Sequence, residues 1–356
     1  MKIDPDIKLD FDDVLLVPQR SYSASRKDVN LKRNFKFYWS SKEWHGVPLM
    51  ASNMDTTGTF KMAETLSQQK MITCLHKHHT LGEHLNKLGK WHGVWPKEYT
   101  WYSLGIKNRE IDGLLKFIDG ANFIPNLCID VANGYTDDFV NFCSGVRQKL
   151  GVEPVIMAGN ICTPEMVQEL ILHGGVDIVK VGIGPGSACT TRLKTGVGYP
   201  QFSAIIECAH AAHGLKSADK RLGLICADGG CRYPADICKA FCANSDFVMV
   251  GGMLAATEEC EGEWIIDDSG NKAAMSFYGM SSEAAQNKHN NGLKKYAASE
   301  GRVKNIDYKG KAQSVAEDIL GGLRSCCSYI GATCLKDMGK CSEFVRVSRV
   351  HFDRSV

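Results

Sequence analysis

Short runs of apolar residues, each bounded by polar or glycine-rich turns, recur along the middle of the chain. Most runs begin roughly 23 to 30 residues after the previous one, which is the length of one strand plus one crossover helix. One interval, between Val181 and Gly223, is longer. The predicted strands are Val47–Ala51, Ile72–Leu75, Trp101–Leu104, Leu127–Val131, Val155–Ala158, Ile178–Val181, Gly223–Ala227 and Phe247–Val250.

Between these runs the spacing of apolar residues changes to that of helices with one buried face, as at Phe139, Val140, Cys143, Val146 and Leu150. Thr163 followed by Pro164 predicts a helix start, because threonine caps a helix and proline fits its first turn. Strands that are apolar throughout are typical of parallel sheets covered by helices. The alternating units therefore favour an α/β fold that is a closed (β/α)8 or TIM barrel over an open doubly wound sheet.

We expect residues 1–356 to form one catalytic domain on this barrel. Residues 1–46 are predicted to be an N-terminal extension, 253–310 a flap or excursion, and 311–332 the final helix.

Three polar stretches are expected to lie outside the barrel. Glu258–Lys272, which is rich in acids, predicts an exposed turn or hairpin. Gln286–Lys295 predicts either a mobile flap or an ordinary solvated loop. Ser217–Leu222 looks like an insertion before the seventh strand and is expected on the barrel face opposite the chemistry.

The charge is nearly balanced, with 42 Lys and Arg against 40 Asp and Glu. This balance argues against a protein held to nucleic acid by phosphate charge. No run approaches about 18 uninterrupted apolar residues, so we expect no membrane span. The N-terminus has no apolar core of a secretory signal, and a cytoplasmic protein with reduced thiols is expected. Most of the 15 cysteines are then small core residues, since none has Cys-x-x-Cys spacing.

Glycine pairs follow the last two predicted strands, in Asp228-Gly229-Gly230 and in Gly251-Gly252. In a barrel, ligands are held by the loops after the strands, and phosphate is held after the seventh and eighth. Paired glycines let backbone N–H groups approach a phosphate without a Cβ in the way. The pattern therefore favours a phosphate site over two tight turns.

Cys189 lies in a glycine-rich segment, residues 182–192, after the sixth strand. The segment is not a dinucleotide fingerprint, because Ser187 stands where the third glycine should fall. A thiol beside an arginine and two threonine hydroxyls is the best candidate for an activated nucleophile, with an inert buried cysteine as the alternative.

His76, His78 and His79 invite comparison with a metal site, but on a strand only His76 and His78 share a face. No carboxylate is visibly placed to complete such a site, so a structural or cofactor-lining role is favoured.

With these motifs in order, the chain resembles the IMP dehydrogenase/GMP reductase family over nearly its whole length. The matching segments are residues 9–15, Asn53-Met54-Asp55-Thr56, His76-Lys77-His78, residues 130–135, 184–192 and 194–201, Asp228-Gly229-Gly230, residues 278–282 and Ser299-Glu300-Gly301. About 25 residues separate His76 from the next strand, which leaves no room for the CBS insert usual in dehydrogenases. Residues 282–300 also lack the arginine of the dehydrogenase flap, so the reductase branch is favoured.

The resemblance implies irreversible, NADPH-dependent conversion of GMP to IMP and ammonia, a step of purine salvage. Cys189 is implied to add to guanine C2, with Thr191 and Glu300 relaying protons, before hydride reaches the thioimidate. A dehydrogenase that lost its insert and a non-catalytic purine-nucleotide-binding barrel are the alternatives.

The resemblance also implies the remaining ligand contacts. The implied GMP contacts are Ser187, Asp228, Gly229, Gly230, Gly251, Gly252, Gly279, Met280, Ser281, Ala297, Ser299 and Gly301. The implied cofactor contacts are Lys77, Asp130, Val131, Ala132, Ile183, Gly184, Met280 and Tyr296, with Ser25, Arg26, Ser325 and Ser328 at a site shared between subunits of a homotetramer. The implied potassium site uses Gly184, Gly186, Cys189 and Arg192.

Some positions depart from the family pattern, among them Asn290-Asn291, which replaces small glycines often found in the flap. Reductases commonly have an arginine after the tyrosine that corresponds to Tyr296, and this chain has Ala297. Lys294 or Lys295 can replace it only as a point charge without a planar fork. We therefore expect weaker or altered nucleotide recognition.

Overall fold

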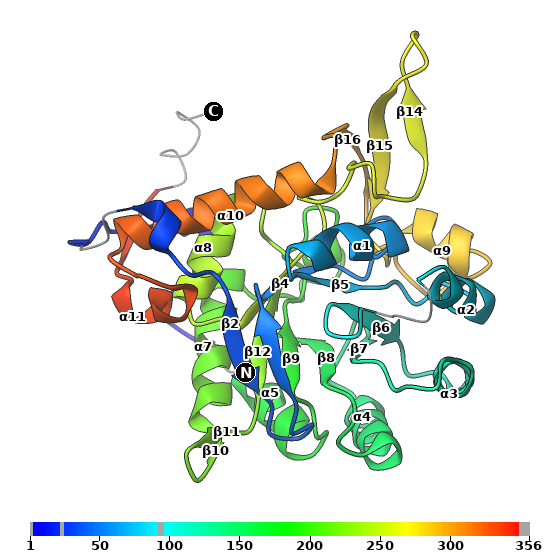
Figure 1. The fold of residues 1–356 in the computed structure, drawn as a ribbon, viewed down its shortest axis with the longest axis horizontal. Helices are drawn as coiled ribbons and strands as arrows, with labels where there is room; N and C mark the ends of the chain where they lie inside the picture. Colours follow the sequence, from blue (N-terminus) through cyan, green and yellow to red (C-terminus); the bar gives the residue numbers. More distant parts are fainter. Residues whose placement is uncertain (1–2, 22–24, 92–95, 349–356) are drawn as a thin grey trace.

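The computed structural model describes residues 3–21, 25–91 and 96–348, and its centre is a closed barrel of parallel strands (Figure 1). The barrel closes in the order β12-β13-β4-β5-β6-β7-β8-β9. The strands are β4 (Leu49–Ala51), β5 (Ile72–Cys74), β6 (Thr100–Leu104), β7 (Leu127–Asp130), β8 (Ile156–Ile161), β9 (Ile178–Val181), β12 (Leu224–Asp228) and β13 (Phe247–Val250). The predicted (β/α)8 barrel and the place of every predicted strand are confirmed, with strand ends that either match or differ by at most three residues.

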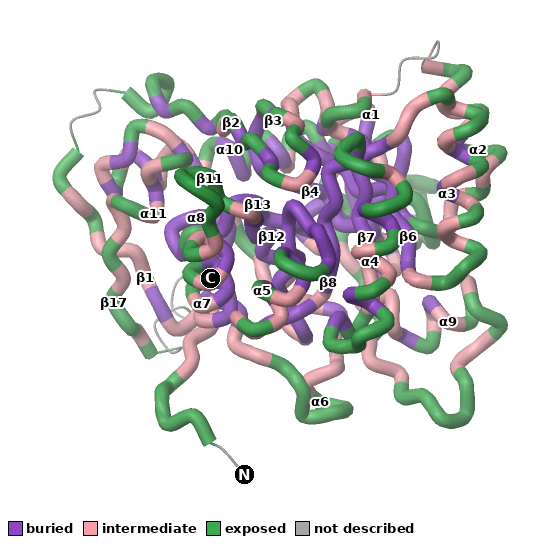
Figure 2. Tube along the Cα trace, turned by 90° about the horizontal axis from the view of Figure 1, so that it is seen from below, coloured by how far each residue is buried: buried purple, intermediate pink, exposed green. Residues whose placement is uncertain are grey.

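Helices surround the strands, so the barrel is buried inside an exposed shell (Figure 2). This shell contains α1 (Phe60–Gln68), α2 (Leu81–Lys90), α3 (Asn108–Ala121), α4 (Asp137–Leu150), α5 (Pro164–Leu172), α7 (Gln201–Gly214), α8 (Pro234–Cys242) and α10 (Ala312–Tyr329). Phe117, Phe139 and Leu170 turn inward and are fully buried. Helix α5 begins at Pro164 as predicted, but Thr163 makes no capping hydrogen bond and instead accepts one from the Tyr135 hydroxyl at 3.1 Å.

The end of the barrel where the strands begin is closed by an aromatic hairpin. Strands β2 (Arg33–Lys36) and β3 (Glu43–Gly46) form this hairpin. Phe35 stacks on Phe247 with ring centroids 4.6 Å apart, and the Trp44 ring packs against Phe247 at a tilt, with centroids 5.5 Å apart. Aromatic pairs of this kind add stability beyond the area they bury. A ligand therefore enters from the opposite end.

The opposite end carries the excursion after β13. Strands β14 (Trp264–Ile266), β15 (Lys272–Tyr278) and β16 (Val303–Asp307) form an antiparallel sheet that projects from the barrel, at the top of Figure 1. The acidic stretch predicted as a hairpin is the β14–β15 hairpin. The stretch predicted as a flap or loop begins inside a helix, α9 (Glu283–His289).

Small elements complete the chain. The suspected insertion forms a short hairpin whose two strands, β10 (Lys216–Ser217) and β11 (Lys220–Arg221), have two residues each. Figure 1 shows this hairpin at the far end of the molecule from β14 and β15. Strand β1 (Val14–Leu16) pairs with β17 (Phe344–Arg346). The short helices are η1 (Phe11–Asp13), η2 (Arg26–Asp28), α6 (Thr191–Thr195), η3 (Leu335–Asp337) and α11 (Met338–Cys341).

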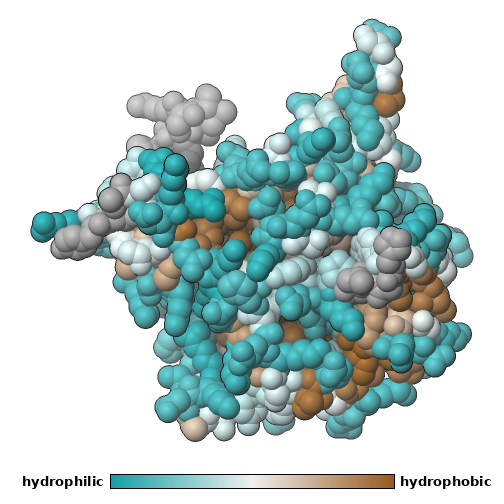
Figure 3. Space-filling model, in the orientation of Figure 1, coloured by the Kyte–Doolittle hydropathy of each residue, from teal (hydrophilic) through white to brown (hydrophobic). Residues whose placement is uncertain are grey.

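The outer surface is mostly hydrophilic on the face shown in Figure 3. Within the described residues, no helix is both long and apolar enough to cross a membrane. All 15 cysteines are free thiols, and ten of them are buried, which confirms the prediction that most are core residues.

Candidate active site

A cavity opens at the carboxyl ends of the barrel strands, and Cys189 lies on its wall. Residues after β4, β9, β12 and β13 line it, as the barrel architecture requires of a ligand site. The cavity continues past Cys189 into a second part lined by Lys77, His78 and residues 130–132. The Cys189 thiol therefore borders both parts of the cavity.

Cys189, Thr191 and Glu300 form a continuous hydrogen-bonded chain. The Cys189 Sγ lies 3.3 Å from the Thr191 Oγ1, and the Thr191 hydroxyl donates to the Glu300 Oε2 at 2.7 Å. Since that hydroxyl proton points at Glu300, the Thr191 oxygen is left to accept from the thiol. The structure thus brings together the three side chains that the sequence analysis assigned to catalysis.

Backbone hydrogen bonds hold this arrangement together by joining residues 188–190 to residues 300–302, which are more than a hundred positions apart in the sequence. The Thr190 N–H donates to the Glu300 carbonyl at 2.8 Å, and the Arg302 N–H donates to the Ala188 carbonyl at 2.9 Å. Cys189 and Gly301 form an antiparallel bridge between these two bonds. A Cβ on Gly301 would lie within 3.0 Å of Ser282, so only glycine fits this crossing without a shift.

The residues predicted to hold phosphate lie together on the cavity wall: Ser187, Gly229, Gly230, Gly251 and Gly252. Gly229 and Gly230 have φ of 86° and 88°, a conformation that favours glycine. A Cβ on Gly252 would come within 3.4 Å of the Ser187 hydroxyl. The wall is therefore open backbone beside one hydroxyl, which suits an anion.

At the cavity floor is a buried lysine that the sequence analysis missed. Lys180 on β9 is 2% exposed, and its Nζ lies 2.6 Å from Asp130 and 3.0 Å from Asp228. Asn160 also donates to Asp228, at 2.8 Å. Burial alone would lower the pKa of Lys180, but the charges of Asp130 and Asp228 raise it well above its usual value. One charged residue inside the apolar run Ile178–Val181 was the available signal.

The predicted base and cofactor contacts are partly brought together. Gly279, Met280, Ile183 and Gly184 line the cavity beside Cys189, and Ser281 lines its second part. Ser299 is not among the described residues that line these two parts, and its hydroxyl accepts from the Glu283 N–H at 3.0 Å, at the start of α9.

Other predicted contacts lie apart from Cys189. Tyr296, which is 84% exposed, and Ala297 line a neighbouring hollow outside α9. Ser25, Arg26, Ser325 and Ser328 are not among the described residues that line these cavities. Arg26 instead lies over the Tyr329 ring, at the end of α10.

Arg192 anchors the segment that is predicted to bind a cation. The Arg192 guanidinium pairs with Asp10 at 3.0 Å and donates to the Tyr199 carbonyl. Two of the predicted carbonyl ligands already accept backbone bonds, Gly186 from Cys189 at 2.9 Å and Arg192 from Gly196 at 3.2 Å. Each retains a second lone pair, so these oxygens fit a cation without being dedicated to one.

The three histidines after β5 form stacked pairs. His76 stacks on His79 with ring centroids 3.6 Å apart, and His78 stacks on His289 at the same separation. Burial lowers the pKa of His76 to about 2, and the His78 N–H donates to its Nδ1 at 3.2 Å. Within residues 3–21, 25–91 and 96–348, no group of three or more His, Cys, Asp or Glu is placed to hold a metal.

The fold and site define a closed parallel barrel with a cysteine on the wall of its cavity. Many families share this barrel, so the comparisons with known proteins identify the family. The family model described as "IMP dehydrogenase / GMP reductase domain" matches residues 8–92 and 115–355, so the chain belongs to that family.

Several relatives that match nearly the whole chain are GMP reductases. The chain is 48% identical over 350 residues to GMP reductase 1 of Homo sapiens, covering 98% of each protein. It is 49% identical over 351 residues to the GMP reductase of Buchnera aphidicola subsp. Schizaphis graminum, covering 98% of this chain and 97% of the relative. It is 47% identical over 354 residues to the GMP reductase of Yersinia enterocolitica, with the same coverage.

Proposed function

We propose that the chain is a GMP reductase, an oxidoreductase that converts GMP to IMP and ammonia at the expense of NADPH. Similarity to curated GMP reductases along nearly the whole chain supports this activity. The observation that carries the mechanism is the Cys189–Thr191–Glu300 chain at the cavity wall.

The first half of the reaction replaces the amino group of guanine by sulfur. The Cys189 proton passes through the Thr191 hydroxyl to Glu300, and the resulting thiolate adds to C2. Ammonia can leave only after protonation, because the bare amide ion is far too basic. Thr191 and Glu300 return the proton to the leaving nitrogen, and acid–base help of this kind typically contributes about 10² to 10⁴ in rate.

The second half reduces C2 and frees the thiol. NADPH, when bound, supplies the hydride to C2 of the thioimidate, and the C2–S bond then breaks to give IMP. Lys77 and residues 130–132 border the second part of the cavity, where the cofactor is proposed to lie next to Cys189. Water must be kept from C2 in this interval, because hydrolysis would give XMP without using hydride.

The cavity wall is proposed to bind the phosphate, the ribose and the purine ring of GMP. The phosphate is proposed to bind Ser187 and the glycine pairs, and the ribose to bind Asp228. Asp228 is fixed for this role, because Lys180 and Asn160 both hold the same oxygen, Oδ2. The purine ring lies near Met280, Ser281, Ser299 and Gly301.

The finer assignments are part of the same proposal. Potassium is proposed to bind carbonyls of Gly184, Gly186, Cys189 and Arg192. Ser25 and Arg26 are proposed to meet the cofactor of a neighbouring subunit in a homotetramer, and Ser325 and Ser328 are proposed as further cofactor contacts. The protein is proposed to act in the cytoplasm.

The test mixes purified protein with GMP and NADPH. NADPH absorbance should fall, IMP and ammonia should appear in equal amounts, and the Cys189→Ala variant should do neither. Incubation of IMP with NAD should give no XMP, which separates the reductase from a dehydrogenase. Tight GMP binding without turnover by the wild type, in potassium, would instead favour a nucleotide-binding barrel and end the proposal.

A further inference from the structure

Asp55 lies on the loop after β4. Its buried carboxylate contacts helix α9 through Lys288 and His289. It is 3% exposed, and its Oδ2 accepts from the Tyr278 hydroxyl at 2.7 Å. The same oxygen accepts from the Lys288 Nζ at 2.9 Å and lies 2.7 Å from the His289 Nε2. Two of these three partners belong to α9, more than 230 positions away in the sequence.

The Asp55 carboxylate is committed to this contact. Burial would raise its pKa, but the hydrogen bonds from Tyr278, His289 and Lys288 keep the pKa below its usual value, so the group stays ionised. Its other oxygen, Oδ1, has no hydrogen-bond partner among the described residues. Charge-assisted hydrogen bonds of this kind are stronger than neutral ones. Asp55 itself is not among the described residues lining the Cys189 cavity.

The helix that Asp55 holds forms one side of that cavity. Ala285, Gln286 and His289 line the second part of the cavity, which also contains Cys189 and Thr191. The His289 ring lies flat against His78, with 9° between their planes. Burial and the neighbouring His289 and Lys77 lower the pKa of His78 to about 4, so this ring is uncharged near neutral pH and stacks without repulsion.

We propose that Asp55 is a positioning residue that clamps α9 over Cys189 and so keeps water from the covalent intermediate. The clamp rests on the proposed function, since it protects the thioimidate on Cys189. If α9 moves out, water adds to C2, the C2–S bond breaks, and a proton goes to sulfur. The net reaction is then GMP plus water to XMP plus ammonia, which transfers no electrons and uses no NADPH.

The test is Asp55→Asn, which keeps the shape of the side chain but removes its charge. We expect the KM for NADPH to rise by about tenfold or more with a smaller change in kcat. The reason is that the substitution removes the charge-assisted hydrogen bonds that hold α9, which lines the part of the cavity where the cofactor is proposed to lie. XMP should appear when the variant is incubated with GMP alone. A loss of folded protein would lower kcat without creating XMP, so the product separates positioning from stability.

Two further variants complete the design. His289→Gln, at the helix, should reproduce the XMP product even if Asp55→Asn folds poorly. Asp267→Asn is the matched control, because Asp267 accepts from Ser269 and Asn271 in the exposed β14–β15 turn. It should leave both KM and products unchanged.

Hydrogen exchange of the α9 amides gives a readout independent of activity. Exchange over residues 285–290 should speed up in Asp55→Asn and in His289→Gln but not in Asp267→Asn. An active wild type whose Asp55→Asn and His289→Gln variants make no XMP and show unchanged exchange overturns the clamp. A wild type that makes no IMP overturns the proposed function instead, while the exchange experiment still tests the clamp.

Discussion

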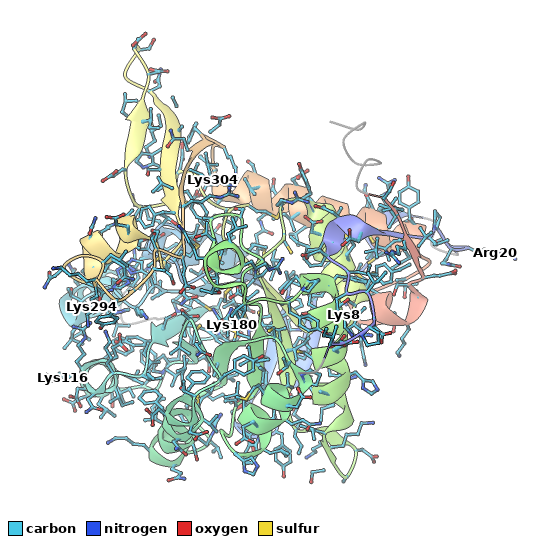
Figure 4. The ribbon with its side chains drawn as sticks, turned by 180° about the vertical axis from the view of Figure 1, so that it is seen from behind. Lys8, Arg20, Lys116, Lys180, Lys294 and Lys304 are labelled. Atoms are coloured by element: carbon cyan, nitrogen blue, oxygen red, sulfur yellow. The ribbon has the colours of Figure 1, made fainter. Side chains whose placement is uncertain are left out.

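The side chain of Lys180, labelled near the centre of Figure 4, is enclosed by the barrel. It is nevertheless charged, because the carboxylates of Asp130 and Asp228 face it. Removal of one partner from a buried ion cluster leaves the others uncompensated, which costs more than the pair contributed. Lys180→Met would leave Asp130 and Asp228 facing each other without a cation. The residue therefore supports the cavity floor as well as the barrel.

Lys180→Met should lower the free energy of unfolding by about 3 to 5 kcal/mol, the range for breaking a buried ion pair. Urea denaturation followed by circular dichroism measures this. Lys36→Met is the control, since Lys36 pairs with Glu43 while its side chain is 59% exposed, and it should change stability little. Equal effects of the two substitutions would contradict the buried-cluster argument.

Ala297 tests how a single departure from the family pattern affects nucleotide binding. It sits beside Tyr296, whose ring is already 5.6 Å from the Lys294 ammonium. Ala297→Arg should lower the KM for GMP or NADPH a few-fold, because an exposed charged contact is worth about 0.2 to 1 kcal/mol.

Steady-state kinetics of Ala297→Arg and Ala297→Lys provide the comparison. Arginine should act more strongly than lysine, because only its planar fork binds two acceptors at once. If neither substitution changes either KM, the expectation of weakened recognition is wrong.

At the scale of elements, one carboxylate joins the helical shell to the closed end of the barrel. Asp246, just before β13, lies 2.7 Å from the His213 Nε2 on α7 and 3.6 Å from the Arg33 Nη2 on β2. It also accepts from the Ile225 N–H of β12 at 3.1 Å. Burial would raise the pKa of Asp246, but His213, Arg33 and the Ile225 N–H hold it below the usual value.

Because its pKa is lower in the folded than in the unfolded protein, Asp246 contributes stability at pH values above the unfolded pKa, about 3.9. That contribution is lost as the pH falls through the lowered folded value. The difference in unfolding free energy between wild type and Asp246→Asn should therefore be full near pH 6 and shrink below about pH 4. Urea titrations across this range measure it.

Asp268→Asn, in the exposed β14–β15 turn, controls for the introduced amide and should change stability little near neutral pH. A difference for Asp246→Asn that grows on acidification would contradict the sign of the effect.

The barrel strands were predictable because their side chains are buried on both faces, which leaves an uninterrupted apolar run such as Phe247–Val250. The position of the glycine pairs and Cys189 on one cavity wall was predictable because barrel ligands bind after the strands. The contact between Asp55 and α9 was not predicted, because the partners are distant in sequence and residues 286–289 of α9 fell in the stretch predicted as a flap or loop. Contacts between excursions depend on tertiary packing, which periodicity does not encode.

At the scale of the whole molecule, the two ends of the barrel differ: one end is closed by packed side chains, and the other carries the cavity. The aromatic hairpin of Phe35 and Trp44 closes one end, and the loops that line the Cys189 cavity occupy the other. The N-terminal segment reaches the end with this cavity as well, since Asp10 accepts from both Arg192 and the Gln201 N–H. The extension therefore braces the Cys189 loop, in addition to preceding the barrel.

Assembly is the property of the whole molecule that the proposed function makes most testable. Ser25 and Arg26 lie beside the C-terminal end of α10, and Figure 1 shows that end and α9 at opposite sides of the molecule. If they meet the cofactor, they do so in a neighbouring chain. In a closed, symmetric oligomer with head-to-tail contacts, every site would then combine Cys189 of one chain with Arg26 of the next.

Two inactive variants should then rescue each other. Cys189→Ala lacks the nucleophile, and Arg26→Ala is expected to lose the contact made by the neighbour. When the two chains are co-expressed with different tags and the mixed oligomer is purified, about a quarter of the sites should hold both intact residues, because each is present in half of the chains. NADPH consumption should recover to that fraction. No recovery in the mixture, or full activity of Arg26→Ala alone, would show that the shared site does not depend on Arg26.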